Sequence, residues 1–304
     1  MGVPLTLALG LYRCVYQANM KSDDLNLLAD REVILLAGGP NTGKSFSVAK
    51  LVQNGQEQGF NVIVLDRDRG LAKAIKEVCG APPDNLDYFL ATTWERVDAA
   101  MDAAFTSLGP GDWFVFEMLG SLWDFAQTEY SRRVYGSLTA HQLALRADAQ
   151  KLIQSQGLDL RATEKGKKDA AQAIVSKKMA YGGLEGRTDW SHIKRMHNDD
   201  LVYRAIIEGT FHVLSTTSLS STGDEQADPK WDIFGKSSVK PDGEKTMVHK
   251  HDTVAVLTKK DNRYLWRTEQ PGGLGKDRGG RPLFKNIDCT DVGMVASYLE
   301  TVGV

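Results

Sequence analysis

Apolar and polar residues alternate along this chain in blocks that match two kinds of element. Short continuous apolar runs, which predict strands buried on both faces of a sheet, occur at residues 33–37, 61–65, 113–116, 211–214 and 253–257. A weaker strand pattern lies at residues 88–90, and helical spacing is found at residues 45–55, 71–79 and 95–108. Strands separated by helices predict an α/β fold with a mostly parallel, twisted sheet flanked by helices.

The sequence between residues 130 and 189 breaks this alternation. It is rich in Ala, Lys, Gln and Leu and carries no strand pattern, which predicts a helical insertion. Within it, residues 146–178 hold eight Lys and Arg against four Asp and Glu. We therefore expect an N-terminal extension at 1–30, a core at 31–290 that includes the insertion at 130–189, and a C-terminal helix at 291–304.

Bulk composition narrows the class of protein. Apolar residues make up 42% of the chain and charged residues 25%, as in folded globular proteins, and the net charge is −2. The three cysteines show no paired spacing, which argues against a zinc site or a disulfide framework.

His249 and His251 lack a third metal ligand and are interpreted as a surface pair. An apolar stretch at 3–16 is too short to cross a bilayer, so we expect a cytoplasmic protein without membrane contact.

A glycine-rich motif follows the first predicted strand and opens the first predicted helix. Its residues are Gly38, Gly39, Pro40, Asn41, Thr42, Gly43, Lys44 and Ser45, followed by Phe46. In this context the motif indicates a phosphate-binding loop, in which backbone N–H groups and the helix N-terminus hold the phosphates of a nucleotide. Lys44 then reaches the β- and γ-phosphates, and the Ser45 hydroxyl ligates Mg²⁺. We predict ATP and Mg²⁺ as the cofactors of an NTP hydrolase.

Acidic residues end two further predicted strands. Glu117 follows the run at 113–116 and is the candidate for the acid that completes the Mg²⁺ shell. Asp66 and Asp68 follow the strand at 61–65, and either is a candidate for the base that activates water. The sequence leaves open which of Asp66, Asp68 and Glu117 is the base, because the run of alternating Asp and Arg also fits a surface ion-pair cluster or a helix cap.

This layout resembles that of RecA-like P-loop ATPases, and most of all the compact RecA-type "AAA domain" proteins of bacteriophages. The resemblance covers roughly residues 30–290, and only the phosphate loop is highly specific. It implies that Asp68 is the catalytic base. It also implies a γ-phosphate sensor at the strand end that contains Thr216 and Thr217, where we assign Thr217 to the role. The chain departs from the family in carrying Glu at 117, Asp at 68 and Thr in place of an amide sensor.

The same resemblance implies cations that act on the nucleotide of a neighbouring subunit. Phage members carry a Lys-Asp-Arg motif near the C-terminus, and this chain has Lys276, Asp277 and Arg278 flanked by glycines. We assign Lys276 and Arg278 as such fingers, which neutralise charge in the transition state. A solvated basic loop is the alternative.

Positive charge is concentrated towards the C-terminus. Residues 240–285 hold eleven Lys and Arg against six Asp and Glu, a net +5 in a chain of −2. This segregation favours a surface that faces a polyanion. Tyr264 and Trp266 alternate with arginines in a way that suits stacking on bases, although strand alternation favours packing in the core.

The stretch at 220–244 is rich in Ser, Gly, Asp and Pro and predicts a long loop at the ligand-binding edge of the sheet. The polymer-binding loops of RecA-like proteins arise at this place. The resemblance therefore implies phosphate contacts from Lys230, Lys236 and Lys240, with simple disorder of the segment as the alternative.

We predict an ATPase that assembles into a ring or filament on single- or double-stranded DNA, of the phage recombination or annealing-helper type, in an infected bacterial cell. A viral translocase or packaging motor with the same core is the first alternative. A monomeric nucleotide-gated switch or small-molecule kinase is the second, and the lack of an arginine-rich lid sequence after the phosphate loop counts against the kinase. The sequence does not distinguish ring from filament, or DNA from RNA.

Overall fold

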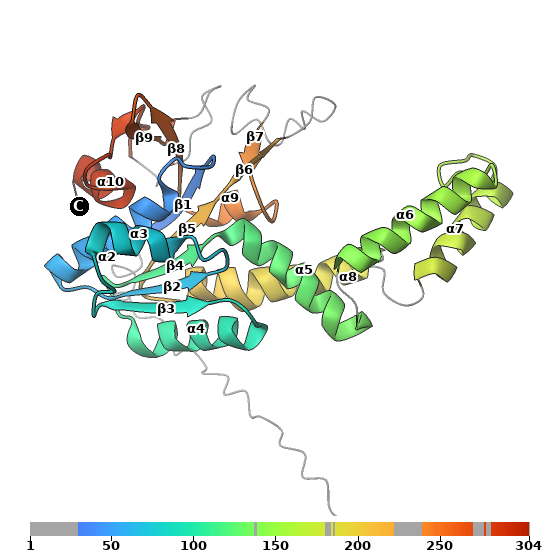
Figure 1. Cartoon of the computed structure of the whole chain (residues 1–304), viewed down its shortest axis with the longest axis horizontal. Helices are drawn as coiled ribbons and strands as arrows, with labels where there is room; N and C mark the ends of the chain where they lie inside the picture. The colour runs from blue at the N-terminus through green and yellow to red at the C-terminus, as the bar shows by residue number, and fades with distance from the viewer. Residues whose placement is uncertain are drawn as a thin grey trace, which may run out of the picture.

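The computed structural model describes residues 30–136, 139–179, 184, 186–221, 239–269, 277 and 281–303, which form a twisted sheet with helices on both faces (Figure 1). The strands of this sheet are β1 (Val33–Gly38), β2 (Val62–Asp66), β3 (Leu86–Leu90), β4 (Trp113–Glu117), β5 (His212–Thr217), β8 (Thr253–Lys260), β9 (Arg263–Arg267) and β10 (Ile287–Asp288). Their order across the sheet is β10-β9-β8-β1-β5-β4-β2-β3. The predicted α/β class is confirmed.

The six strands from β8 to β3 run parallel, and β9 and β10 continue the sheet in antiparallel orientation. Register places their carboxyl ends together: Asp66 of β2 pairs with Glu117 of β4, and Ala37 of β1 pairs with Thr217 of β5. The strand that carries Glu117 is separated from β1 by β5. All polar strand ends named from the sequence therefore meet at one edge of the sheet, where ligands bind in open α/β folds.

Helices cover both faces of the sheet (Figure 1). They are α2 (Lys44–Gln58), α3 (Leu71–Cys79), α4 (Trp94–Ser107), α5 (Leu119–Tyr135), α6 (Thr139–Ser155), α7 (Lys165–Met179), α8 (Gly186–Lys194), the π-helix η1 (Arg195–Glu208), α9 (Met247–Lys250) and α10 (Met294–Val302). One core contains residues from α2, α3 and α10, and the other contains residues from α4, α5, α9 and η1. This arrangement gives three layers around two apolar cores.

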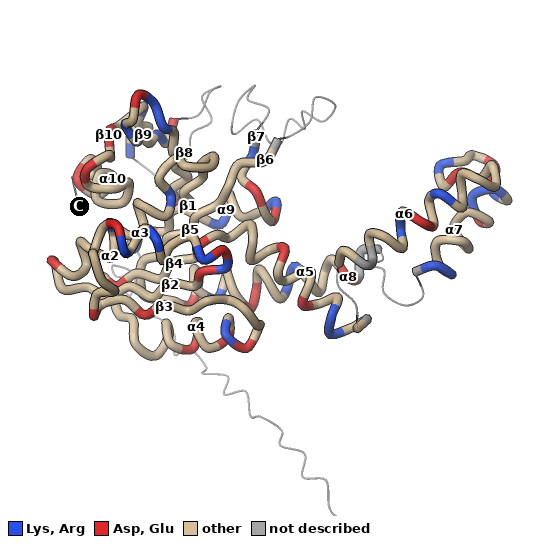
Figure 2. The backbone as a smooth tube through the Cα atoms, viewed as in Figure 1, with Lys and Arg blue, Asp and Glu red and all other residues tan. Residues whose placement is uncertain are grey.

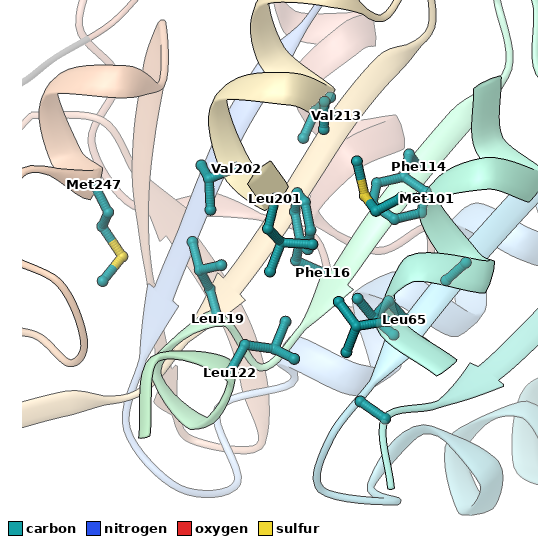
Figure 3. Packing of buried hydrophobic residues seen from close by; sticks show 14 of the residues in the cluster. Leu65, Met101, Phe114, Phe116, Leu119, Leu122, Leu201, Val202, Val213 and Met247 are labelled. Carbon is teal, nitrogen blue, oxygen red and sulfur yellow. The ribbon is translucent and has the colours of Figure 1, made fainter. Parts of the chain in front are cut away.

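Alternation along β1 shows why the strands are apolar throughout. Leu35 and Ala37 enter the core on the α4, α5 and η1 side, whereas Ile34 and Leu36 enter the core on the α2, α3 and α10 side, and all four are fully buried. Figure 3 shows the core on the α4, α5 and η1 side. In it, Leu65, Phe114, Phe116 and Val213 of the strands pack against Met101, Leu119, Leu122, Leu201, Val202 and Met247. Burial of one Leu or Phe side chain contributes about 1.5–3 kcal/mol to the stability of the fold. The side chains on both faces of the sheet therefore stabilise its packing against the helices.

The range named as a helical insertion, 130–189, includes the end of α5, all of α6 and α7, and the start of α8, and α5 already begins at Leu119. The pair α6 and α7 packs together and projects from the sheet as an arm (Figure 1). Ala149, Ile153 and Ala171 are its buried residues, while most of its charged side chains are exposed. Tyr130 Oη donates a 2.8 Å hydrogen bond to Asp189 Oδ1 and thereby joins α5 to α8 at the foot of the arm.

Two expectations need correction. The stretch at 220–244 is not a simple loop, because its ends form the antiparallel pair β6 (Leu219–Ser221) and β7 (Val239–Pro241). Lys240 lies on β7 and is half-buried, whereas Lys230 and Lys236 lie outside the described residues. His251 is not on the surface: it is fully buried, and its ring nitrogens contact Met247 O and Ser215 Oγ at 2.7 and 2.8 Å.

Within the described residues, no helix combines the length and the apolar character that a membrane span requires.

Candidate nucleotide-phosphate site

The phosphate loop connects β1 to α2 through backbone conformations that favour glycine. Gly43 has φ 96°, and an added Cβ would lie 2.9 Å from Tyr264 Cδ1. A Cβ on Gly38 would lie 2.4 Å from Thr42 Oγ1. No side chain caps the N-terminus of α2, so its first N–H groups point to the carboxyl edge of the sheet without a side-chain acceptor. Uncapped N–H groups at a helix N-terminus after a glycine-rich turn are an arrangement that favours anions in proteins.

Lys44 lies inside this loop. Its Nζ donates hydrogen bonds to Gly38 O and Gly39 O at 2.8 and 2.9 Å, and the residue is 8% exposed. Burial lowers the pKa of the Lys44 ammonium, and the Glu117 charge opposes this shift. The ammonium is thus held by two neutral carbonyl oxygens, and a phosphate oxygen, which is itself charged, would be a stronger acceptor.

A short chain of hydrogen bonds links the loop to two other strands. Ser45 Oγ donates to Glu117 Oε1 at 2.6 Å, and Thr216 Oγ1 donates to Glu117 Oε2 at 2.5 Å. Glu117 is 1% exposed. The carboxylate of β4 therefore contacts the first turn of α2 on one side and the end of β5 on the other.

The environment of Glu117 opposes its ionisation. Burial raises the pKa of the carboxyl, the hydrogen bonds from Ser45 and Thr216 lower it, and the charge of Asp66 raises it further. The carboxylate and the two hydroxyl groups that contact it are hard oxygen ligands of the kind that suit Mg²⁺.

The two aspartates after β2 have different surroundings. Asp66 is fully buried; its carboxylate accepts bonds from the backbone N–H groups of Asp68, Arg69 and Leu71 and from the hydroxyl of Tyr88. It therefore holds the turn that starts α3, as a cap does. Asp68 is exposed and accepts a 3.0 Å bond from Ser121 Oγ.

Asp68 also belongs to the turn that approaches the phosphate loop. A Cβ on Gly70 of this turn would lie 3.6 Å from Ser45 Oγ. Asp68 is thus an exposed acid on a turn beside the phosphate loop, with Ser121 as its partner on α5. Of the two aspartates, this is the one whose oxygens reach solvent at the site.

The two threonines named at the end of β5 have different partners. Thr217 Oγ1 donates to Asp242 O at 2.7 Å, away from the carboxylate, whereas the neighbouring Thr216 contacts Glu117. Successive side chains of a strand point to opposite faces, so only one of two adjacent residues can reach a given group. Thr217 joins β5 to the segment after β7.

Lys276 and Arg278 lie outside the described residues, and the structure does not place them. Asp277 between them is described: its Oδ1 accepts bonds from Thr253 Oγ1 at 2.9 Å and from Tyr298 Oη at 2.7 Å. Thr253 begins β8, so Asp277 is anchored at the amino edge of the sheet, opposite to the phosphate loop.

Two side chains make contacts at the site that the sequence alone did not assign to them. Ser121 contacts Asp68, and Tyr264 packs on Gly43 and stacks against Phe46 with ring centroids 5.6 Å apart. Serine in the segment after Glu117 was a usable signal for Ser121. No local pattern connects Tyr264 to the phosphate loop, because the contact depends on how β9 joins the sheet.

No protein-family model matches the chain, and no curated protein matches it. Among solved structures it is similar to "ATPase Domain of G40P", with a TM-score of 0.38, 10% sequence identity, and coverage of 84% of this chain and 79% of that chain.

Proposed function

We propose that this protein binds ATP with Mg²⁺ at the loop between β1 and α2 and hydrolyses the bond between the β- and γ-phosphates. The observation that supports this most directly is the hydrogen bond between Ser45 Oγ and Glu117 Oε1. It joins the hydroxyl of the phosphate-loop motif to a buried acid on another strand, which is the pairing that a P-loop NTPase needs for its metal ion.

The residues of the chain have complementary roles in this proposal. Lys44 exchanges the carbonyls of Gly38 and Gly39 for the β- and γ-phosphates, and the N–H groups at the start of α2 hold the remaining oxygens. Ser45 and Glu117 would hold Mg²⁺. When bound, this ion neutralises charge that develops on the phosphate oxygens.

Asp68 is the base in this proposal. It is exposed and oriented by Ser121, so it can hold a water molecule for attack on the γ-phosphate. Thr216 orients Glu117 and, being next to Thr217, connects the carboxylate to the segment that follows β7. Asp66 keeps the turn in shape and takes no part in the chemistry.

We further propose that the ATPase acts as an oligomer on nucleic acid, with Lys276 and Arg278 acting on the neighbouring subunit. The net +5 of residues 240–285 supports a polyanion partner. Lys259, Lys260 and Arg263 flank the turn between β8 and β9, next to the strand that leads into the phosphate loop. Figure 2 shows Lys and Arg positions in blue near the labels of β8 and β9.

The experiment measures ATP turnover with and without single-stranded DNA, together with particle size by light scattering. We expect DNA to stimulate turnover in an assembled particle, and Lys44→Ala to remove both ATP binding and turnover. Lys73→Ala, an exposed lysine of α3, serves as the matched control. A Lys44→Ala protein that binds and splits ATP like the parent overturns the ATPase proposal. If the protein stays monomeric and its ATP turnover does not change with DNA, only the proposal that it acts as an oligomer on nucleic acid is overturned.

A further inference from the structure

Two aromatic side chains lie beside the phosphate loop without a role in the chemistry above. Phe46 is in the first turn of α2, and Tyr264 is on β9; their rings stack at 30° with centroids 5.6 Å apart. Both residues are half-buried, so each ring keeps part of its surface open to solvent. Lys50 Nζ lies 5.7 Å from the Phe46 centroid and Lys259 Nζ lies 5.3 Å from the Tyr264 centroid.

The position of Tyr264 is fixed by the sheet. Its backbone N–H donates to Thr290 Oγ1 and its carbonyl accepts from Cys289 N, both at 2.9 Å, and it pairs with Lys259 across the β8 and β9 ladder. The two strands are joined by Asp261 and Asn262, both with positive φ, which is the two-residue turn that suits a twisted hairpin. The ring is therefore pre-organised against Gly43.

The sheet order decides which end of a triphosphate this pair faces. Glu117, Thr216 and Asp68 come from β4, β5 and the turn after β2, on one side of β1. Tyr264 comes from β9, on the other side of β1. If the γ-phosphate lies towards the acids, the nucleoside at the far end of the triphosphate leaves the loop towards β9. This step rests on the proposed function.

We infer that Phe46 and Tyr264 form the nucleobase subsite, in which the base stacks on the Tyr264 ring. An aromatic ring offers a flat apolar face to any base. Lys50 Nζ beside the Phe46 ring and Lys259 Nζ beside the Tyr264 ring add positive charge next to the subsite. Stacking reads the face of a base and not its edges. The subsite therefore contributes affinity for a nucleoside triphosphate over inorganic triphosphate.

The experiment compares ATP with inorganic tripolyphosphate, both with Mg²⁺, by calorimetric titration of the full chain. We expect Tyr264→Leu to weaken ATP binding about 5- to 100-fold. The affinity for tripolyphosphate should change by less than about twofold. Tyr264→Phe restores ATP affinity because the ring is kept. Tyr203→Leu, which removes a tyrosine of η1 that is 38% exposed, is the control away from the loop.

Each other outcome has a defined meaning. If Tyr264→Leu weakens the binding of ATP and of tripolyphosphate equally, the ring only supports Gly43 and the inferred nucleobase subsite is wrong. An unchanged affinity for ATP would also refute the subsite. Phe46→Leu keeps the backbone of α2 and is expected to show the same selective loss, so the inference stays testable if Tyr264→Leu does not fold. Lys44→Ala should weaken both ligands, and its failure to do so counts against the proposed function instead.

Discussion

Ser45 Oγ and Glu117 Oε1 lie 2.6 Å apart although the residues are separated by 72 positions in the chain. The contact joins the N-terminal turn of α2 to the carboxyl end of β4. Between these two strands lies β5, whose penultimate residue, Thr216, donates to the second oxygen of the carboxylate. The metal-binding groups of the proposed ATPase are thus positioned by three strands.

Glu117→Gln is expected to lower ATP turnover by about 100-fold or more, because loss of the anionic ligand removes several kcal/mol of charge stabilisation from the transition state. ATP binding in the absence of Mg²⁺ should change little, since Lys44 and the backbone groups remain. Turnover and ATP affinity are measured on the same preparations. Unchanged turnover at saturating Mg²⁺ would show that Glu117 is not a ligand.

Asp66→Asn is expected to lower mainly the free energy of unfolding, and Asp68→Asn is expected to lower mainly ATP turnover. The buried Asp66 carboxylate accepts three backbone N–H bonds, so its substitution should cost about 2 kcal/mol of unfolding free energy. The exposed Asp68 should change stability by less than about 0.5 kcal/mol but lower turnover by about 100-fold, as loss of a general base does. Denaturant unfolding and turnover distinguish them. A large stability loss in Asp68→Asn, or normal turnover, contradicts the division.

The acid limb of kcat/KM is expected to lie above pH 4.5, the ordinary pKa of Glu, because burial raises the pKa of Glu117 in the free protein. Turnover efficiency then falls as pH decreases through this raised pKa, since the protonated carboxyl does not bind Mg²⁺. Thr216→Val removes a bond that favours the ionised form, so its acid limb should move to still higher pH. A shift to lower pH in Thr216→Val would refute this assignment.

The free energy of unfolding is expected to rise between pH 8 and 10.5 because of Lys250. Burial lowers the pKa of Lys250 to about 8 from 10.5, and its Nζ, 3.8 Å from Glu244 Oε2, makes no hydrogen bond among the described residues. In that range the unfolded chain binds more protons than the folded protein, so stability increases with pH, by an amount on the order of 3 kcal/mol.

The measurement is denaturant unfolding at several pH values for the parent and for Lys250→Met. The variant should lose this part of the pH dependence. Lys194→Met is the matched control, because Lys194 also lies near Glu244, at 3.6 Å from Oε1, but its side chain is half exposed. Equal slopes in the parent and Lys250→Met would show that Lys250 does not titrate in this range.

Much of the core was readable from the sequence because its signals are local. The apolar runs of β1, β2 and β4 each enter cores on both faces of the sheet, so their patterns are continuous and easily recognised. β9 was less clear, since only Trp266 of its aromatic residues is fully buried while Tyr264 is half-buried. β6 and β7 are three residues each and were hidden in a polar stretch.

The sequence by itself determined the phosphate loop and the acidic ends of the strands, because a glycine pattern and a polar residue after an apolar run depend only on neighbouring residues. The tertiary structure decided which threonine contacts Glu117, which aspartate is buried, and that Tyr264 lies on Gly43. These choices depend on the order of strands in the sheet and on the face to which each side chain points. Strand periodicity shows that neighbouring residues point to opposite faces, but only the packed sheet determines which face lies towards the site.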